Sequence, residues 1–93
     1  MFAHLAVHHP KPEHADDLLA AMHKVDAAAQ GAPGLIRIGA WRDERTDRLI
    51  GLALWDSKEA FEAAAPSIFA AVAGEPLDEW STSPPDSLHL HPA

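Results

Sequence analysis

Four short segments of this sequence alternate between two kinds of side chain, and this alternation constrains the fold more than any other feature. Each has the length and the period of two that are typical of a β-strand: residues 2–9, 35–42, 48–55 and 87–91. One set of side chains is aliphatic: Ala3, Leu5, Val7, Ile36, Ile38, Ala40, Ile50, Leu52, Leu54, Leu88 and Leu90. The other set is mixed: Phe2, His4, Ala6, His8, Arg37, Gly39, Trp41, Leu49, Gly51, Ala53, Trp55, His89 and His91. We expect helices to pack on the aliphatic face and the mixed face to line an enclosed pocket.

Two further segments have the apolar spacing of amphipathic helices, from about residue 12 to residue 31 and from about residue 57 to residue 74. Asp56 is the expected N-cap of the second helix, because a glutamate follows three positions later. Pro66 is expected to kink or split this helix, since proline removes a backbone donor. Residues 77–86 are expected to be irregular.

The resulting order, β-α-β-β-α-β, predicts one α+β domain over residues 1–93 with ferredoxin-like topology. Its four-stranded antiparallel sheet would carry both helices on one face, with the first strand between the third and the fourth. Two helices cover only one face, so the other needs a partner. We therefore expect a homodimer in which the mixed faces of two chains pack together and enclose an interior between or within the subunits.

The formal net charge of −7, from 14 acidic against 7 basic residues, argues against nucleic acid and anionic membranes as partners. No apolar run approaches the roughly 20 residues of a membrane-spanning helix. The absence of cysteine excludes disulfides and thiolate chemistry and favours a cytoplasmic location.

One segment carries a family resemblance: Gly51-Leu-Ala-Leu-Trp55-Asp-Ser57-Lys-Glu59-Ala60-Phe61. A strand that ends in Trp-x-Ser-x-Glu-Ala-aromatic and enters a helix resembles the antibiotic biosynthesis monooxygenase family, whose members are dimeric α+β barrels. The resemblance implies cofactor-independent oxygenation of phenols, anthrones or quinols. In that reaction the substrate loses a proton and the resulting anion reacts with dioxygen.

The match to that family is incomplete at the residues that carry the chemistry. Trp55 matches the substrate-pocket tryptophan, but Gly51 stands where aromatic-polyketide oxygenases have asparagine and Phe61 where they have tyrosine. The haem-degrading branch needs an asparagine, a tryptophan and a histidine at places that here hold about Ala6, Ala64 and Ala73. The resemblance therefore disfavours haem degradation and transfers the fold better than the chemistry.

Histidines are the candidate catalytic residues. His4 and His89 should meet on neighbouring strands, where a neutral imidazole can act as a base in place of the missing tyrosine and asparagine. The alternative is that these histidines are ordinary strand-end residues. Their spacing fits no strong metal motif, so we expect neither a metal ion nor a cofactor.

The candidate substrate-binding residues are Trp55, Arg37, Trp41, Phe61, Gly51 and His8. Trp55 either stacks on a flat substrate or fills the dimer core, and Trp41 is favoured as a packing residue. Arg37 either holds an anionic oxygen or pairs with an acid across the dimer. Gly51 either provides cavity volume or marks a bulge.

Three functions remain open at this point. The first is a cofactor-independent monooxygenase that oxidises a small aromatic phenol, anthrone or quinol. The second is a module of the same fold that binds a small ligand or dimerises without catalysis. The third is a barrel that binds haem or a metal through its histidines.

Overall fold

All 93 residues are described by the computed structural model. The chain forms, in order, the strand β1 (Phe2–Pro10), a 3-10 turn (Pro12–His14), the helix α1 (Ala15–Ala29), the strands β2 (Leu35–Arg42) and β3 (Leu49–Trp55), the helix α2 (Lys58–Ala70) and the strand β4 (Ser81–Leu90). Neither helix has the length and apolar character that crossing a membrane requires.

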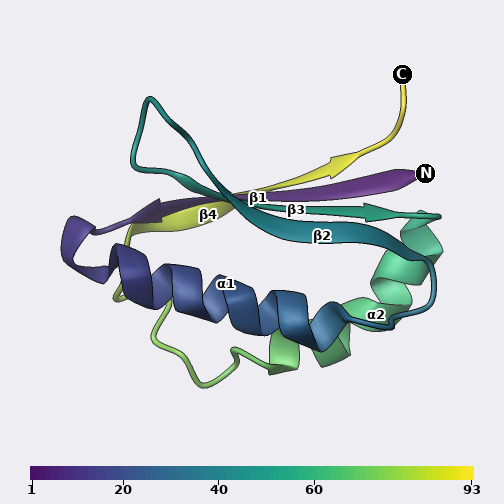
Figure 1. Cartoon of the computed structure of the whole chain (residues 1–93), viewed down its shortest axis with the longest axis horizontal. Coiled ribbons are helices and arrows are strands. Elements are labelled where there is room, and N and C mark those ends of the chain that lie inside the picture. Colours follow the sequence, from purple (N-terminus) through teal and green to yellow (C-terminus); the bar gives the residue numbers. More distant parts are fainter.

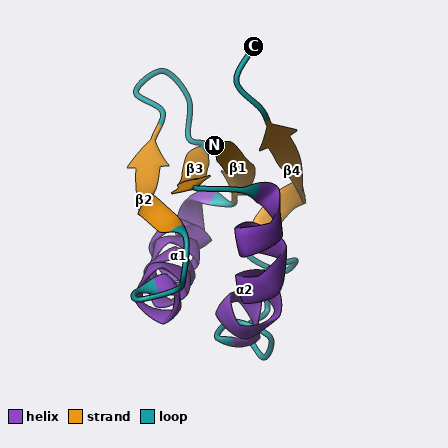
Figure 2. Ribbon diagram, turned by 90° about the vertical axis from the view of Figure 1, so that its right-hand side faces the viewer, coloured by secondary structure: helices purple, strands orange, loops and turns teal.

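The four strands form one antiparallel sheet in the order β2-β3-β1-β4. Both helices lie against the same face of this sheet, and the opposite face is bare (Figures 1 and 2). Figure 2 shows α1 beneath the β2 side and α2 beneath the β4 side. The ferredoxin-like α+β fold and the central position of β1 are therefore confirmed.

The assignment of the two sheet faces is wrong for three of the four strands. Phe2, Leu49 and Trp55 are fully buried in the helix-side core, so the mixed sets of β1 and β3 face the helices. The mixed set of β4 lies on the same side, because His89 pairs with His4. Phe2 and Trp55 pack there with Phe61 and Ile68 in one core cluster, and the burial of these large aromatic side chains favours this orientation.

In β2 the mixed set faces away from the helices, because this strand contains a bulge. Between Leu35 and Arg37 the pairing with β3 shifts by one residue, which leaves two residues of β2 opposite one of β3. Ile38 and Ala40 therefore face the helices, opposite Ala53 and Gly51, as the sequence predicts for them. The same bulge puts Arg37 and Trp41 on the bare face.

The bare face is apolar, and we call it the outer face. It carries Leu5, Val7, Ile50, Leu52, Leu54, Leu88 and Leu90, with Trp41 and Arg37 at its β2 edge. Trp41 is 51% exposed and Leu90 is 41% exposed, values that are unusual for such large apolar side chains. In β1, β3 and β4 the aliphatic set thus lies on the outer face, opposite to the expectation, whereas in β2 it faces the helices as expected.

Strand β4 is longer than the sequence suggests, since it begins at Ser81 rather than residue 87. It runs through Pro84 and Pro85, which lack a backbone donor, yet it pairs only with β1. An edge strand tolerates proline where its backbone faces solvent. The register also shifts on either side of His9, so the pairing is irregular at this end of β4.

The start and the course of α2 also differ from expectation. Ser57, not Asp56, is the N-cap, and its side chain accepts a hydrogen bond of 3.1 Å from the Ala60 backbone N–H. The Asp56 backbone N–H instead donates to the Gly34 carbonyl oxygen at 2.8 Å, which ties the helix start to the entry of β2. Helix α2 continues through Pro66 to Ala70, so the proline does not split it.

Two glycines in the α1–β2 connection have positive φ angles, and they allow a matched test of this packing. Gly31 (φ 80°) has open space where a Cβ would be, whereas a Cβ on Gly34 (φ 84°) would lie 2.6 Å from the Ala60 Cβ. We expect Gly31→Ala to lower the free energy of unfolding by about 1–2 kcal/mol through the backbone alone. Gly34→Ala should cost clearly more, because α2 must also shift. Urea unfolding of both variants measures the difference, and equal losses would contradict this packing.

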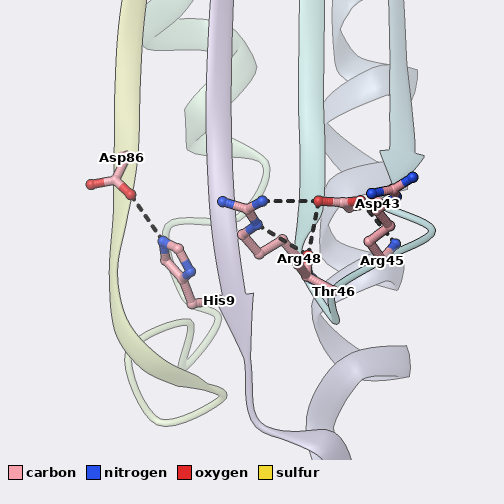
Figure 3. Close-up of polar contacts among 6 residues, drawn as sticks. All are labelled: His9, Asp43, Arg45, Thr46, Arg48 and Asp86. Atoms are coloured by element: carbon pink, nitrogen blue, oxygen red, sulfur yellow. Dashed lines mark hydrogen bonds and ion pairs between the residues drawn. The ribbon is translucent and has the colours of Figure 1, made fainter.

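The β2–β3 hairpin loop is ordered by Asp43 (Figure 3). Its carboxylate accepts hydrogen bonds from the Arg45 backbone N–H at 3.0 Å, from the Thr46 hydroxyl at 2.9 Å and from the Arg48 guanidinium at 2.9 Å. These bonds, the backbone N–H first, hold the pKa of Asp43 below its usual value. Figure 3 also shows His9 bonded to Asp86 at 2.9 Å, which links β1 to β4.

Candidate functional site

A cavity of about 140 Å³ lies within the chain, between the sheet and the two helices. An apolar protein cavity of about 150 Å³ holds one benzene molecule, so this cavity has the size of a single aromatic ring. The sequence leaves open whether the pocket lies between or within the subunits, and this cavity lies within one chain. The mixed sets that line it face the helices of their own chain and not the sheet of a partner. One chain forms this cavity by itself, and the cavity is partly open to solvent.

Small residues on the sheet and aromatic residues around them create the cavity. Gly51, Ala53 and Ala6 line it from β1 and β3. The hollow persists because the side chains at these positions are too short to reach the helices. Trp55 and Phe61 line the same cavity, with ring centroids 6.0 Å apart and planes at 67°. Aromatic rings in this arrangement suit a flat ligand.

His4 is the most closely held polar side chain of the cavity. Its ring stacks on Phe61 with centroids 4.8 Å apart and planes at 24°. Its Nε2 atom lies 2.9 Å from the Ser87 hydroxyl on β4. Burial lowers the pKa of His4 below its ordinary value, and His89 and His8 lower it further. His4 is therefore neutral at physiological pH, the state in which an imidazole accepts a proton.

His8 lines the cavity two positions further along β1 than Ala6. Burial is the main cause that lowers the pKa of His8, and the neighbouring His9 contributes. Both cavity histidines therefore prefer the neutral form. Neutral imidazoles can donate or accept hydrogen bonds, depending on which nitrogen carries the proton.

These lowered pKa values predict a dependence of stability on pH. A histidine whose folded pKa lies below its unfolded value of about 6.5 stabilises the protein fully above that pH. The contribution is lost as the pH falls from there towards the folded pKa. We expect the free energy of unfolding to fall between about pH 7.5 and pH 5.5, and less steeply in His8→Gln. The exposed His23→Gln is the control, and an unchanged slope in His8→Gln would contradict the burial of His8.

Two further polar groups belong to the cavity and were not predicted. Asp26 lines it from α1, and burial raises the pKa of this carboxyl while His23 opposes the rise. The indole N–H of Trp55 is buried without a hydrogen-bond partner, which costs about 1–3 kcal/mol. Asp26 is four residues after Met22 on α1, so the two side chains lie on the same side of the helix. This spacing is the one feature of the sequence that points to Asp26 as a cavity residue.

The structure brings together five of the eight residues that the sequence singled out. His4, His8, Gly51, Trp55 and Phe61 all line the cavity. His89 does not line it, but its ring lies 5.3 Å from that of His4 and 5.6 Å from that of Phe61. The catalytic role of His4 and the binding roles of the other four remain predictions.

Arg37 and Trp41 are the residues that the structure keeps apart from the cavity. The Arg37 guanidinium lies 5.8 Å from the centre of the Trp41 ring, and both side chains are on the outer face. The expectation that they share a face with His4 is therefore wrong, because the β2 bulge turns the side chains of Arg37 and Trp41 to the outer face. No group of three or more histidine and acidic side chains is arranged to hold a metal ion.

Three comparisons place these features among known proteins. The profile of the antibiotic biosynthesis monooxygenase family matches residues 1–67. A comparison with curated protein sequences finds no match. Solved structures match nearly the whole chain, but their sequence identities are so low that they show the fold alone.

Three of these structures illustrate the range. The protein Rv0793 of Mycobacterium tuberculosis has a TM-score of 0.85 and 18% identity, with 99% of this chain and 94% of that chain covered. SnoaB, a cofactor-independent oxygenase of Streptomyces nogalater solved as a mutant, has a TM-score of 0.79 and 16% identity over 98% and 91%. A mutant of MhuD with two manganese protoporphyrin IX molecules per active site has a TM-score of 0.77 and 20% identity over 98% and 93%.

Proposed function

Because this chain belongs to the antibiotic biosynthesis monooxygenase family, we propose that it is a cofactor-independent monooxygenase acting on a small quinol. The observation that carries the proposal is a neutral imidazole, His4, in an apolar cavity of one ring's size. The cavity of about 140 Å³ favours a single-ring quinol over a three-ring anthrone.

The reaction balances without a further reductant when the substrate is a quinol. One oxygen atom of dioxygen replaces a ring hydrogen and the other leaves as water, so a quinol becomes a hydroxyquinone. The ring supplies all the electrons that dioxygen takes up, two in forming the quinone and two in forming the new C–O bond. A simple phenol balances in the same way, because phenol and dioxygen give a quinone and water, so the electron balance admits both substrate classes.

His4 is suited to the first step, which removes a proton from a ring hydroxyl. When its Nε2–H donates to the Ser87 hydroxyl, Nδ1 carries the lone pair that accepts this proton. The phenolic hydroxyl has an ordinary pKa of about 10, so proton loss is unfavourable in water at neutral pH. The resulting anion transfers electrons to dioxygen far more readily than the neutral quinol does. His89, next to His4, would act through that residue and not on the substrate.

Oxygen uptake with a panel of alkyl-substituted hydroquinones tests this function. We expect the protein to raise the rate well above spontaneous oxidation and to place one labelled oxygen atom in each hydroxyquinone when labelled dioxygen is supplied. Gly51→Leu keeps His4 but should abolish the activity, because a Cβ at this position already lies 3.7 Å from the Met22 Cε and a longer side chain fills the cavity. A wild-type rate equal to the spontaneous rate would reject the function.

The proposed enzyme is a homodimer in which the outer faces of two chains contact each other. This face leaves Leu88, Leu90 and Trp41 between 39% and 51% exposed, and such a patch marks an interface. A second copy is the simplest partner, because a self-complementary sheet face suits two-fold symmetry. The helix-side cavity then lies away from the interface, the reverse of the arrangement expected from the sequence.

Ligand binding without turnover is the second candidate. It is supported by His4 itself, because Phe61 and Ser87 hold the imidazole in place and leave only one ring nitrogen free. Saturable binding of a quinol without oxygen uptake would favour this role. Formation of the labelled hydroxyquinone would exclude it.

A further inference from the structure

Asp26 is a polar cavity residue to which the proposed function assigns no role. It lies on α1, and it lines the same cavity as His4 and His8, which belong to β1 on the opposite wall. Its backbone carbonyl accepts a hydrogen bond from the Gln30 side chain, but its carboxylate makes no hydrogen bond or ion pair within the chain. An acceptor with this position and no partner is free to bind a ligand.

The charges around the cavity are uneven. No lysine or arginine lines it, and the two lining histidines have lowered pKa values, so both favour the neutral form. Asp26 is thus the single formal charge among the lining side chains. His23, three residues earlier on α1, acts against the effect of burial on the pKa of Asp26, and its side chain is exposed. A negative charge beside an apolar cavity interacts more strongly than it would in water.

We propose that Asp26 determines the ligand specificity of the cavity: it selects neutral aromatic rings with a second hydrogen-bond donor and excludes aromatic carboxylates. A ring with donors at both ends can place one hydroxyl at His4 and offer the other to the Asp26 carboxylate. A carboxylate at that second position meets a like charge, and no lysine or arginine lines the cavity to offset it. The inference deepens the proposed function, and rests on it, by naming neutral quinols with their two hydroxyls in para positions as the substrate class.

Binding measured without turnover separates the two proposals. The probes are para-hydroxybenzyl alcohol and para-hydroxybenzoate, which have one phenolic hydroxyl each, similar size and no quinol chemistry. Calorimetry in the absence of oxygen gives the dissociation constant of each probe for the intact protein. The variants are Asp26→Asn and the charge-retaining Asp26→Glu. Asp16→Asn on the exposed side of α1 removes the same net charge and is the matched control.

We expect the wild type to bind the alcohol at least about tenfold more tightly than the carboxylate, a difference of about 1.4 kcal/mol. Asp26→Asn should bring the two constants close to each other, while Asp26→Glu and Asp16→Asn keep the preference. Equal binding of both probes by the wild type, binding of neither, or an unchanged preference in Asp26→Asn would each overturn the proposal. A preserved preference without oxygen uptake from quinols would reject the oxygenase function alone.

Discussion

His4→Ala is expected to lower the rate of quinol oxygenation by about 10²–10⁴-fold, the usual contribution of a positioned base. The physical reason is that His4 is the neutral imidazole that stacks on Phe61 at 4.8 Å and lines the cavity beside Trp55. Oxygen uptake at saturating quinol measures the loss. Because the lowered pKa keeps His4 neutral, the acidic limb of the wild-type pH profile should lie below about 6.5.

His14→Ala is the control for this variant. His14 lies in the turn before α1 and does not line the cavity, so its removal should leave the rate within about twofold of the wild type. His4→Gln retains polarity and most of the volume but supplies no base, and it should be as inactive as His4→Ala. Full activity in His4→Gln would remove His4 from the reaction and leave the cavity without its proposed base.

Leu5→Asp is expected to convert the proposed dimer of about 20 kDa, twice the chain mass of 10.0 kDa, into a monomer. Leu5 lies on the central strand β1 and pairs with Leu52 and Leu88, so it sits in the middle of the outer face. A carboxylate buried there against a second sheet would have no partner, and an isolated buried charge costs several kcal/mol. Sedimentation at micromolar concentration measures the mass.

Ala28→Asp is the matched control, because it introduces the same charge on the exposed side of α1. It should leave the mass of the assembly unchanged. A wild type that sediments as a monomer would contradict the proposed interface. A Leu5→Asp variant that remains a dimer would also contradict the interface, because the two chains would then associate through a surface other than the outer face.

The sequence predicts the element order and the central place of β1 because these follow from local patterns and short connections. It does not predict which face the helices cover. Both faces of β1 are rich in apolar or aromatic side chains, and alternation alone gives two sets without saying which is inside. The deciding fact is that Phe2 and Trp55 fit among Phe61 and Ile68, and this emerges only from packing.

Two features of the sheet lie beyond the reach of pattern analysis for different reasons. The β2 bulge at residue 36 adds one residue opposite β3, and nothing in the local sequence marks it, since Ile36 is an ordinary strand residue. Strand β4 passes through Pro84 and Pro85 because an edge strand has one partner only. That exception cannot be recognised before the strand order is known.

The cavity itself could be predicted in part. His4, His8, Gly51, Trp55 and Phe61 were singled out because small, aromatic and imidazole side chains alternate with aliphatic ones. Asp26 was missed because an acid on an amphipathic helix is ordinarily a solvent-facing residue. The sequence places Arg37 on the wrong face, because the bulge in β2 turns its side chain to the outer face.

The central claim is that a small aromatic ligand binds inside each chain, beside His4 and between the sheet and the helices. The most direct measurement follows the imidazole NMR signals of the seven histidines during an oxygen-free titration with hydroquinone. The account predicts saturable shifts at His4 and His8, with His14 and His23 unmoved. Shifts confined to histidines outside the cavity, or no shift at saturating hydroquinone, would contradict it.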